Sequence, residues 1–431
     1  MEAQMRQNGT INDKWNRRTL TPAEATDRLL ACVRPRTGFE EVPLAEAIGR
    51  RLAVDATTKE PIPHFRRAGM DGYAVRLEDV AAASSEEPCE LEIVEHIPCG
   101  AVPLRKLERG QAARIMTGGM VPEGADAVVM QEMAEAACGH GREYVRIRKA
   151  DPRGTHLTPI GEEAAEGTIL LRAGQLIGAG EMADLATLGS SRVKVFRKPR
   201  VAILSTGTEL LDVAAPLEPG KVRNSNAYML AALIASAGGE AVPAGTVPDD
   251  CDRAERLLGE LLASDADAVV ATGGVSVGDY DIMADYFLRW EGTTLFNKVA
   301  MRPGSPTTAG VWKEKLLFGL SGNPSACFVG FELFVRPALL AMQRSYAAAD
   351  WEFAAYLAED YLKVNAYARY VRGRAELREG RVEARPIGLD QSSAVLSIKD
   401  ANCLIVIPPT KSGIRRGELV KAIRLGGVIV P

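Results

Sequence analysis

The sequence predicts a multidomain protein with an α/β domain on a mostly parallel sheet, an inserted small β domain and a C-terminal β-barrel-like domain. The chain has 431 residues, more than one ordinary core accommodates. Between residues 196 and 345, continuous apolar runs alternate with helical patterns, which is typical of a parallel sheet. Residues 65–150 and 346–431 instead carry short strand-like segments between turn residues.

The N-terminal region predicts one helix followed by short strands. A helix is expected over residues 21–33, because Thr21 is a good N-cap and Pro22 suits the first turn. Residues 65–150 contain the strand candidates CELEIVEHI, ARIMTGG, DAVVMQE and EYVRIRK. The segment 156–195 mixes short strands with a helix, and we expect it to return beside the N-terminal helix. Residues 65–150 would then be an insertion.

The central region predicts alternating strands and helices. Strands are expected in RVAILSTGTEL, EAVPAGTVPDD, DAVVATGG and KLLFGL, and helices in NSNAYMLAALIASAGG, CDRAERLLGELLASDA, DIMADYFLRW and SACFVGFELFVRPALLAM. After residue 346 the strand candidates are YVRGRAELREG, RVEARPI, NCLIVIPP and GELVKAIRL. This order indicates an α/β layer followed by a small all-β domain.

Composition excludes several classes of function. A net charge of -4 argues against a general nucleic-acid-binding protein. No apolar run approaches the roughly 18 residues of a membrane helix, and no signal peptide opens the chain. The seven cysteines and four histidines lack the spacing of a disulfide framework or a zinc site. We therefore expect a reduced, cytoplasmic protein that binds neither nucleic acid nor membrane.

Polar, acidic and glycine residues follow each predicted parallel strand. Ligands of such sheets bind at the carboxyl ends of the strands, so these residues are expected at one edge. NKVAMRPGSPT adds Lys298 and Arg302 near the same edge. In chain order, the residues after the strands are Thr206, Gly207, Glu209, Asp249, Asp250, Gly273, Gly274, Ser276, Gly278, Asp279, Asp281, Ser321, Gly322, Asn323 and Ser325.

Each of these features also has a purely structural explanation. Glycine turns need positive φ angles, Asp249 or Asp250 can cap the next helix, and SGNP can be a turn with a helix-starting proline. Together, however, helix N-termini, carboxylates and cations favour a phosphorylated ligand bridged by Mg²⁺. The spacing matches neither the Walker P-loop nor GxGxxG, so kinase and NAD-dependent activities are less favoured.

Four motifs in this region, GGVSVGDYD, STGTEL, RPGSPT and SGNPSA, resemble the molybdopterin molybdenumtransferase family, the MoeA/gephyrin E-domain group. GMDGYAV, RIMTGGMVPEGADAVVMQE and GEEAAEG are similar to further signatures of that family. The resemblance runs from about residue 19 to the C-terminus in the family's order. It implies Mg²⁺-dependent insertion of molybdate into adenylylated molybdopterin, with release of AMP.

The resemblance also implies a domain organisation and partners. The domains would be 15–62 plus 156–195 (N-terminal mixed α/β), 63–155 (inserted small β), 196–345 (α/β, molybdopterin-binding-like) and 346–431 (C-terminal β). The protein would be a homodimer, with each active site between the α/β domain of one subunit and the inserted domain of the other. Molybdopterin adenylyltransferase and molybdenum enzymes would be transient partners.

Residue roles are implied by the same motifs. Asp71, Glu209, Asp249 and Asp279 would be catalytic, and Glu209, Asp249, Asp279 and Asp281 would hold the metal, with Asp250 in support. Lys298, Arg302, Arg372 and Ser392 would bind the oxyanion. The phosphates would be bound by Thr206, Gly207, Gly273, Gly274, Ser276, Gly278, Ser321, Gly322, Asn323 and Ser325.

Three positions depart from the commonest family pattern, namely Glu163, Ser305 and Ser321. Glu163 stands where many relatives have Asp, which makes it a weaker site candidate. A changed preference between metal oxyanions is an alternative consequence of the three departures together. Two alternatives stay open, a molybdopterin adenylyltransferase-like enzyme and a non-catalytic scaffold of the same fold. The four-domain length argues against the first, and Asp71 with Asp279 argues against the second.

Overall fold

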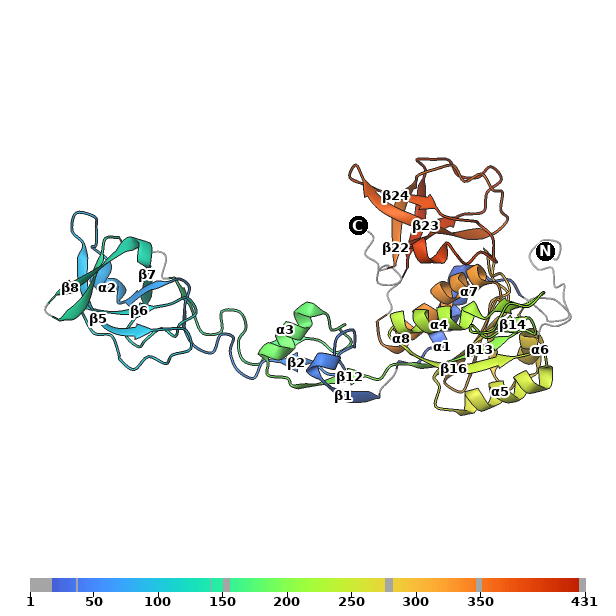
Figure 1. The fold of residues 1–431 in the computed structure, drawn as a ribbon, viewed down its shortest axis with the longest axis horizontal. Coiled ribbons are helices and arrows are strands. Elements are labelled where there is room, and N and C mark those ends of the chain that lie inside the picture. The colour runs from blue at the N-terminus through green and yellow to red at the C-terminus, as the bar shows by residue number, and fades with distance from the viewer. Residues whose placement is uncertain are drawn as a thin grey trace, which may run out of the picture. The chain divides into compact units, whose positions relative to one another are not determined.

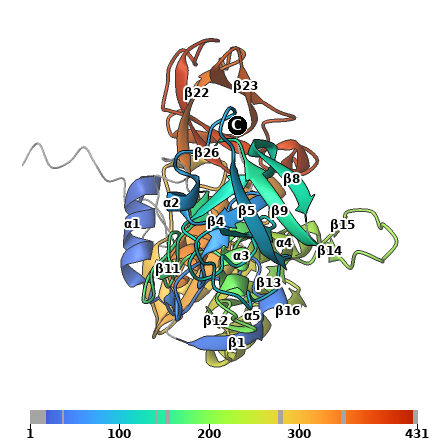
Figure 2. The ribbon, with the colours of Figure 1, turned by 90° about the vertical axis from the view of Figure 1, so that its left-hand side faces the viewer.

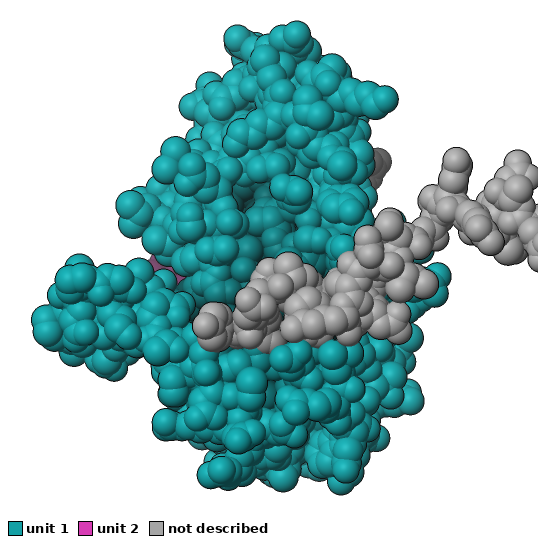
Figure 3. Space-filling model, turned by 90° about the vertical axis from the view of Figure 1, so that its right-hand side faces the viewer, with its two compact units in different colours: residues 1–53, 174–178, 192–431 teal, residues 54–173, 179–191 magenta. Residues whose placement is uncertain are grey.

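The computed structural model describes residues 18–35, 38–139, 141–149, 156–275, 282–345 and 351–425. The chain forms two compact units, which Figure 3 colours separately. Unit 1 comprises residues 1–53, 174–178 and 192–431, and unit 2 comprises residues 54–173 and 179–191. The predicted fold class, α/β combined with β domains, is confirmed.

Unit 1 contains a six-stranded sheet in the order β16-β13-β17-β21-β20-β18. The first four strands are parallel, and β20 and β18 are antiparallel at one edge. A mostly parallel sheet was predicted and is present. The bounds are β13 (Arg200–Thr206), β16 (Glu240–Val247), β17 (Ala268–Thr272), β18 (Thr293–Phe296), β20 (Thr308–Trp312) and β21 (Lys315–Leu320).

Helices cover both faces of this sheet (Figure 1). Neighbouring residues of β13 enter different cores, since Ile203 packs in one cluster with Leu230 of α4 and Leu204 packs in another with Leu258 of α5. A strand buried on both faces gives a continuous apolar run, which is how β13 reads in the sequence. The helices are α4 (Ser225–Ser236), α5 (Cys251–Ala263) and α6 (Ile282–Arg289).

Helix α1 (Pro22–Cys32) packs differently from the sequence-based expectation. A capping box begins it, because Thr21 and Glu24 exchange hydrogen bonds with each other's backbone N–H groups. Its buried residues, Ala25 and Leu29, join the core that contains Leu230. The helix was expected beside residues 156–195. Its apolar face is instead buried against the helices and strands of the α/β sheet, because Ala25 and Leu29 pack into the apolar core there.

One long helix, Pro324–Met342, is made of α7 (Pro324–Gly330), the π-helical turn η3 (Phe331–Val335) and α8 (Arg336–Met342). Its length and hydropathy match those of a membrane-crossing helix, so the expectation that no run would do so was wrong. Within the most apolar 18-residue window of this helix, 94% is buried inside the protein. A central core helix is apolar on all sides for the same reason as a membrane helix.

The C-terminal strands form a closed five-stranded barrel, because β23 pairs with both β24 and β25 (Figure 1). β19 (Met301–Arg302), which belongs to the RPGSPT region, pairs with the start of β23. The barrel-like C-terminal domain predicted from the sequence is present. Its strands are β22 (Glu352–Leu357), β23 (Ala368–Arg378), β24 (Arg381–Pro386), β25 (Cys403–Ile407) and β26 (Leu419–Arg424).

Unit 2 contains a second six-stranded sheet in the order β7-β4-β6-β5-β9-β8. Figure 2 labels its strands β4, β5, β8 and β9. The sequence predicted β5, β6, β7 and β9. It missed β4 and β8, since AEAACG in β8 lacks the β-branched and aromatic residues typical of strands. The strands are β4 (Gly72–Val75), β5 (Cys89–Ile97), β6 (Gln111–Ile115), β7 (Ala127–Met130), β8 (Ala134–Gly139) and β9 (Arg142–Ile147).

Short strand pairs join the part of the chain that precedes this sheet in the sequence to the part that follows it. β1 (Phe39–Pro43) pairs with β12 (Arg192–Phe196), β2 (Ala56–Thr57) with β11 (Ile169–Leu171), and β3 (Arg67–Ala68) with β10 (Leu157–Thr158). Each pair is antiparallel, so the chain departs and returns along the same path. The remaining helical elements are α2 (Leu77–Val80), α3 (Ala179–Thr187) and the 3-10 turns Leu44–Glu46, Gln131–Met133 and Ile398–Asp400.

An ion pair inside the long helix generates a stability prediction. Glu332 and Arg336 are 2% and 3% exposed, and their closest contact is 2.6 Å. Glu332→Gln would leave the Arg336 charge buried without its counter-ion, so we expect it to lower the free energy of unfolding by about 3–5 kcal/mol. Chemical denaturation followed by tryptophan fluorescence measures this, because Trp351 lies 5.7 Å from the Arg336 guanidinium.

The control is Glu352→Gln, which removes a carboxylate from the exposed pair with Lys421. Exposed pairs contribute little, so this change should stay below about 1 kcal/mol. Equal losses in the two variants would contradict the prediction.

Candidate active site

A cavity of about 690 Å³ lies at the carboxyl ends of β13 and β17. The chain passes from β13 to β16 on one side of β13, and then to β17 on the other side. Parallel sheets bind ligands at such a topological switch point. The cavity is lined by Thr206, Gly207, Glu209, Leu210, Val222, Arg223, Asn224, Ser225, Asn226, Asp249, Thr272, Gly273, Gly274, Val275, Ser321, Gly322, Asn323, Pro324, Ser393 and Val395.

The structure brings many of the sequence-predicted site residues together in this cavity. Four others, Ser276, Gly278, Asp279 and Asp281, lie outside the described residues. The predicted residues found in the lining are Thr206, Gly207, Glu209, Asp249, Gly273, Gly274, Ser321, Gly322 and Asn323.

Gly273 sets how closely two of the strand ends approach. Its φ angle is +104°, and a Cβ atom at this position would lie 2.2 Å from the Thr206 carbonyl oxygen. Its N–H donates to the Leu320 carbonyl at 3.0 Å. Only glycine fits here, because any side chain would push the turn off the end of β13. The structural explanation of this glycine therefore holds, and the close approach it permits shapes the cavity.

Two carboxylates line the cavity from neighbouring loops. The Thr208 N–H and hydroxyl both donate to Asp249 Oδ2, at 3.1 and 2.8 Å, which joins the β13 loop to the end of β16. The Glu209 carboxylate folds over Gly207, where a Cβ atom would lie 2.5 Å from Glu209 Oε2. Asp250 instead caps α5, accepting the Arg253 N–H at 2.9 Å. The two adjacent aspartates thus have different roles.

These oxygen donors are the type that Mg²⁺ prefers. Within the described part of the chain, no group of three or more His, Cys, Asp or Glu side chains is arranged to hold a metal ion. Mg²⁺ commonly takes one or two protein carboxylates together with phosphates of a substrate, so Glu209 and Asp249 are the carboxylates of this cavity that would hold it.

The N-terminus of α4 is a part of the site that the sequence interpretation treated only as a helix cap. Asn224 accepts the Ala227 N–H through its side chain, and Ser225 and Asn226 of the first turn line the cavity. N–H groups at a helix start favour anions. The signal available in the sequence was NSN at the start of the predicted helix, three polar residues that suit a helix N-terminus.

Asn226 also connects three loops of the site. It is buried, and its amide nitrogen donates to Thr272 Oγ1 at 2.9 Å and to the Gly322 carbonyl at 2.8 Å. The Thr272 hydroxyl in turn donates to the Ser321 carbonyl at 3.0 Å. These bonds fix the end of β17 and the SGNP turn relative to α4.

The SGNPS turn offers fewer free donors than the sequence suggested. The Asn323 N–H donates to Ser321 Oγ at 3.2 Å, and the Ser325 N–H donates to the Ser392 carbonyl at 3.0 Å. Pro324 has no N–H. Two of the four N–H groups of this turn are therefore engaged within the protein.

The basic residues implied by the resemblance, Lys298, Arg302 and Arg372, do not line the cavity, whereas Arg223 does. Arg372 is buried and donates to Ser325 Oγ, to Ser397 Oγ at 3.0 Å and to the Leu389 carbonyl at 2.5 Å. Burial lowers the pKa of its guanidinium. Arg372 thus connects the barrel to the start of α7.

Asp71 lies in unit 2, directly before β4. The Thr117 hydroxyl and N–H both donate to its Oδ1 at 2.7 Å. These two bonds, with a smaller contribution from the Arg114 charge, lower the pKa of the Asp71 carboxyl. Asp71 is therefore ionised at neutral pH. Glu163, also in unit 2, forms an ion pair with Arg67 at 3.1 Å.

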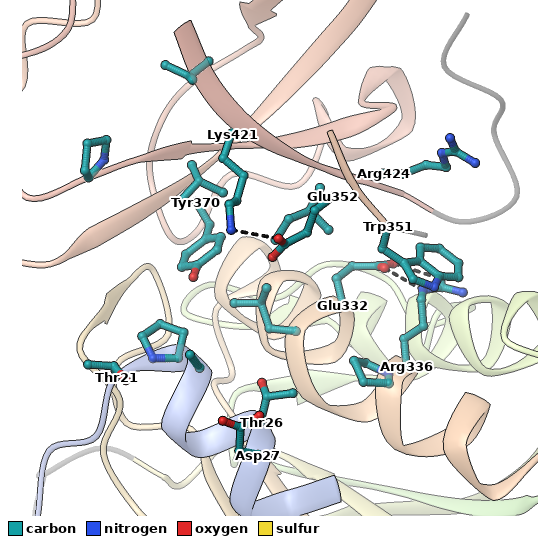
Figure 4. A pocket seen from close by; sticks show the side chains of 18 of the residues that line it. Thr21, Thr26, Asp27, Glu332, Arg336, Trp351, Glu352, Tyr370, Lys421 and Arg424 are labelled. Carbon is teal, nitrogen blue, oxygen red and sulfur yellow. Dashed lines mark hydrogen bonds and ion pairs between the residues drawn. The ribbon is translucent and has the colours of Figure 1, made fainter. Parts of the chain in front are cut away.

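A second cavity, of about 570 Å³, lies between α1, the long helix and the barrel (Figure 4). The pairs Glu332–Arg336 and Glu352–Lys421 lie on its walls among apolar side chains. None of the site residues predicted from the sequence lines it. We therefore assign the candidate active site to the cavity at the strand ends.

Comparison with protein-family models covers almost all of the described chain. Residues 20–189 match the MoeA N-terminal region (domain I and II), residues 202–341 match a probable molybdopterin binding domain, and residues 354–425 match the MoeA C-terminal region (domain IV). The resemblance identified from the sequence motifs is confirmed.

Known relatives agree with these matches. The chain is 42% identical over 407 residues to the molybdopterin molybdenumtransferase of Bacillus subtilis, covering 94% of each chain. It is 40% identical to that of Staphylococcus epidermidis over 88% of this chain and 90% of the relative. The crystal structure of the molybdopterin biosynthesis MoeA protein from Pyrococcus horikosii is 32% identical, with a TM-score of 0.80 over 95% of this chain and 100% of that chain. The chain therefore belongs to the MoeA family.

Proposed function

We propose that the chain is a molybdopterin molybdenumtransferase of molybdenum cofactor biosynthesis. It takes adenylylated molybdopterin and molybdate, and it yields the molybdenum cofactor and AMP in a Mg²⁺-dependent step. One observation carries this proposal: a single cavity at the strand ends is lined by two carboxylates, Glu209 and Asp249, and by the first turn of α4. The names of the relatives supply the substrate class.

The charges of the cavity suit a substrate that carries phosphates. The N–H groups of Ser225 and Asn226 favour phosphate oxygens, while Glu209 and Asp249 would repel them. Mg²⁺ bound by the two carboxylates would neutralise charge on the phosphate linkage that is broken. Thr208 holds Asp249 through one oxygen atom, Oδ2, and so orients Oδ1. Asp279 and Asp281 remain proposed as further metal residues.

Asp71 is proposed to act as an ionised carboxylate. A general base works best with a pKa near the operating pH, and the pKa of Asp71 is lowered instead. Electrostatic or metal-organising work is therefore favoured over proton abstraction. We propose that the protein is a cytoplasmic homodimer in which Asp71 of one subunit serves the cavity of the other. Molybdopterin adenylyltransferase and molybdenum enzymes are proposed transient partners.

The proposed reaction is tested by AMP release from adenylylated molybdopterin with Mg²⁺ and molybdate. Asp249→Asn should reduce the rate at least ~100-fold, because it removes one of the two carboxylates proposed to hold the Mg²⁺ that neutralises charge on the phosphate linkage. Asp250→Asn is the matched control, since Asn caps a helix as well as Asp does and the rate should change less than about twofold. The proposal would be wrong if the wild-type protein released no AMP under conditions in which a known relative does.

Thr117→Val tests the role of the Asp71 charge. The hydroxyl bond is the largest cause of the lowered pKa, so its loss should raise that pKa toward the ordinary value. The ionised form is the active one, and the acid limb of the pH–rate profile for AMP release should therefore move to higher pH. Thr117→Ser keeps the hydroxyl and should leave the limb in place. An unmoved limb in Thr117→Val would show that Asp71 ionisation does not govern the rate.

Subunit complementation tests the shared site. Asp71→Asn and Asp249→Asn should each be inactive alone. After the two variants are mixed, unfolded and refolded together, half of the dimers combine them and hold one intact site, so about a quarter of the wild-type rate should return. No recovery in a sample that is dimeric by light scattering would argue that both residues act within one subunit.

A further inference from the structure

A loop of the barrel, residues 387–397, forms one wall of the candidate active site. Ser393 and Val395 line the cavity, and the Ser392 carbonyl accepts the Ser325 N–H at the start of α7. The loop follows β24 and leads to the 3-10 turn Ile398–Asp400. It is therefore the segment through which the barrel reaches the strand-end cavity.

Burial does not hold this loop in place. None of residues 387–397 is buried, and the apolar side chains of Leu389 and Leu396 are 67% and 82% exposed. A loop that buries so little apolar surface gains little stability from the hydrophobic effect. Its position must therefore depend on polar contacts.

Asp390 makes the densest set of these contacts. Its Oδ2 accepts from the Tyr361 hydroxyl at 2.5 Å, from Arg369 Nε at 2.9 Å and from Lys363 Nζ at 3.0 Å. Its side chain is 18% exposed. Hydrogen bonds between charged groups in a partly buried place are stronger than neutral ones.

The ionised state of this carboxylate is part of the anchor. Burial acts to raise the pKa of Asp390, but the hydrogen bonds from Tyr361 and Lys363 and the charge of Arg369 outweigh burial, so the pKa is lowered. The carboxylate also raises the pKa of Tyr361, adding to the effect of burial. Both shifts keep Asp390 an acceptor and Tyr361 a donor at neutral pH.

Two other hydrogen bonds of the loop lie on either side of Asp390 in the sequence. Arg372 donates to the Leu389 carbonyl, one residue before Asp390, and the Ser392 carbonyl follows two residues after it. Arg369, the donor on β23, lies opposite Arg302 of β19 in the sheet register. The same carboxylate thus connects the barrel strand next to the RPGSPT segment with the loop that walls the cavity.

We propose that Asp390 is a positioning residue of the substrate site: through Tyr361, Lys363 and Arg369 it holds the 387–397 loop where Ser393 and Val395 wall the cavity. Asp390 does not touch the substrate. Its effect on the reaction is transmitted by the loop, and this kinetic part rests on the proposed function.

The test uses Asp390→Asn in the full-length protein, with two readouts. Hydrogen exchange of the 387–397 peptide should accelerate by about tenfold, because charged hydrogen bonds that hold the loop are lost. KM for adenylylated molybdopterin should rise by about tenfold. The kcat should change less than about threefold, because no reacting group is lost. Asp390→Glu should recover part of both effects. Tyr361→Phe removes a single donor and should give smaller changes of the same kind, which keeps the test valid if Asp390→Asn does not fold.

Asp360→Asn is the matched control, because Asp360 lies on the same barrel and binds Arg415 and Arg416 instead of the loop. It should change neither loop exchange nor KM by more than about twofold. Unchanged exchange in the Asp390 variant, or faster exchange with wild-type KM, would overturn the proposal. A wild-type protein without AMP release would overturn the proposed function instead, and the exchange data would still decide whether Asp390 holds the loop.

Discussion

The close approach of the turn after β17 to the end of β13 is the constraint on which the candidate site depends. A side chain at Gly273 would collide with the Thr206 carbonyl at 2.2 Å. With glycine there, the ends of β13, β17 and β21 lie close enough for Asn226 to bond both Thr272 and Gly322. Close-packed strand ends then leave one cavity into which several loops contribute polar groups.

The sheet and the loops around the cavity are stabilised by different interactions. Burial holds the sheet, because β13 is covered on both faces by separate apolar cores. Hydrogen bonds hold the loops around the cavity, since residues such as Thr208, Asp249 and Ser392 are exposed and fixed by specific donors. A rigid sheet with polar loop anchors suits a site that must keep its geometry while it binds a large charged substrate.

Hydrogen bonds also fix the loop of the barrel, residues 387–397, that lines the cavity. From the barrel side, Arg372 donates to the Leu389 carbonyl of the 387–397 loop and Arg369 donates to the Asp390 carboxylate of the same loop. From the α/β side, the Ser325 N–H donates to the Ser392 carbonyl. Arg372 was expected to meet an oxyanion directly, and in this structure its donors serve Ser325, Ser397 and Leu389. A buried guanidinium needs hydrogen-bond partners, and each of the three guanidinium nitrogens of Arg372 donates to a protein acceptor here.

Sequence by itself determined the fold class and most elements, because apolar periodicity and turn residues act locally. It also placed Glu209, Asp249 and the glycines at one edge, since parallel strands end on the same side. Only the tertiary structure decided which aspartate caps α5, that α1 packs on the α/β core, that α4 contributes its N-terminus, and that the cavity's lining arginine is Arg223. Those outcomes depend on contacts between residues far apart in the chain, which local pattern does not encode.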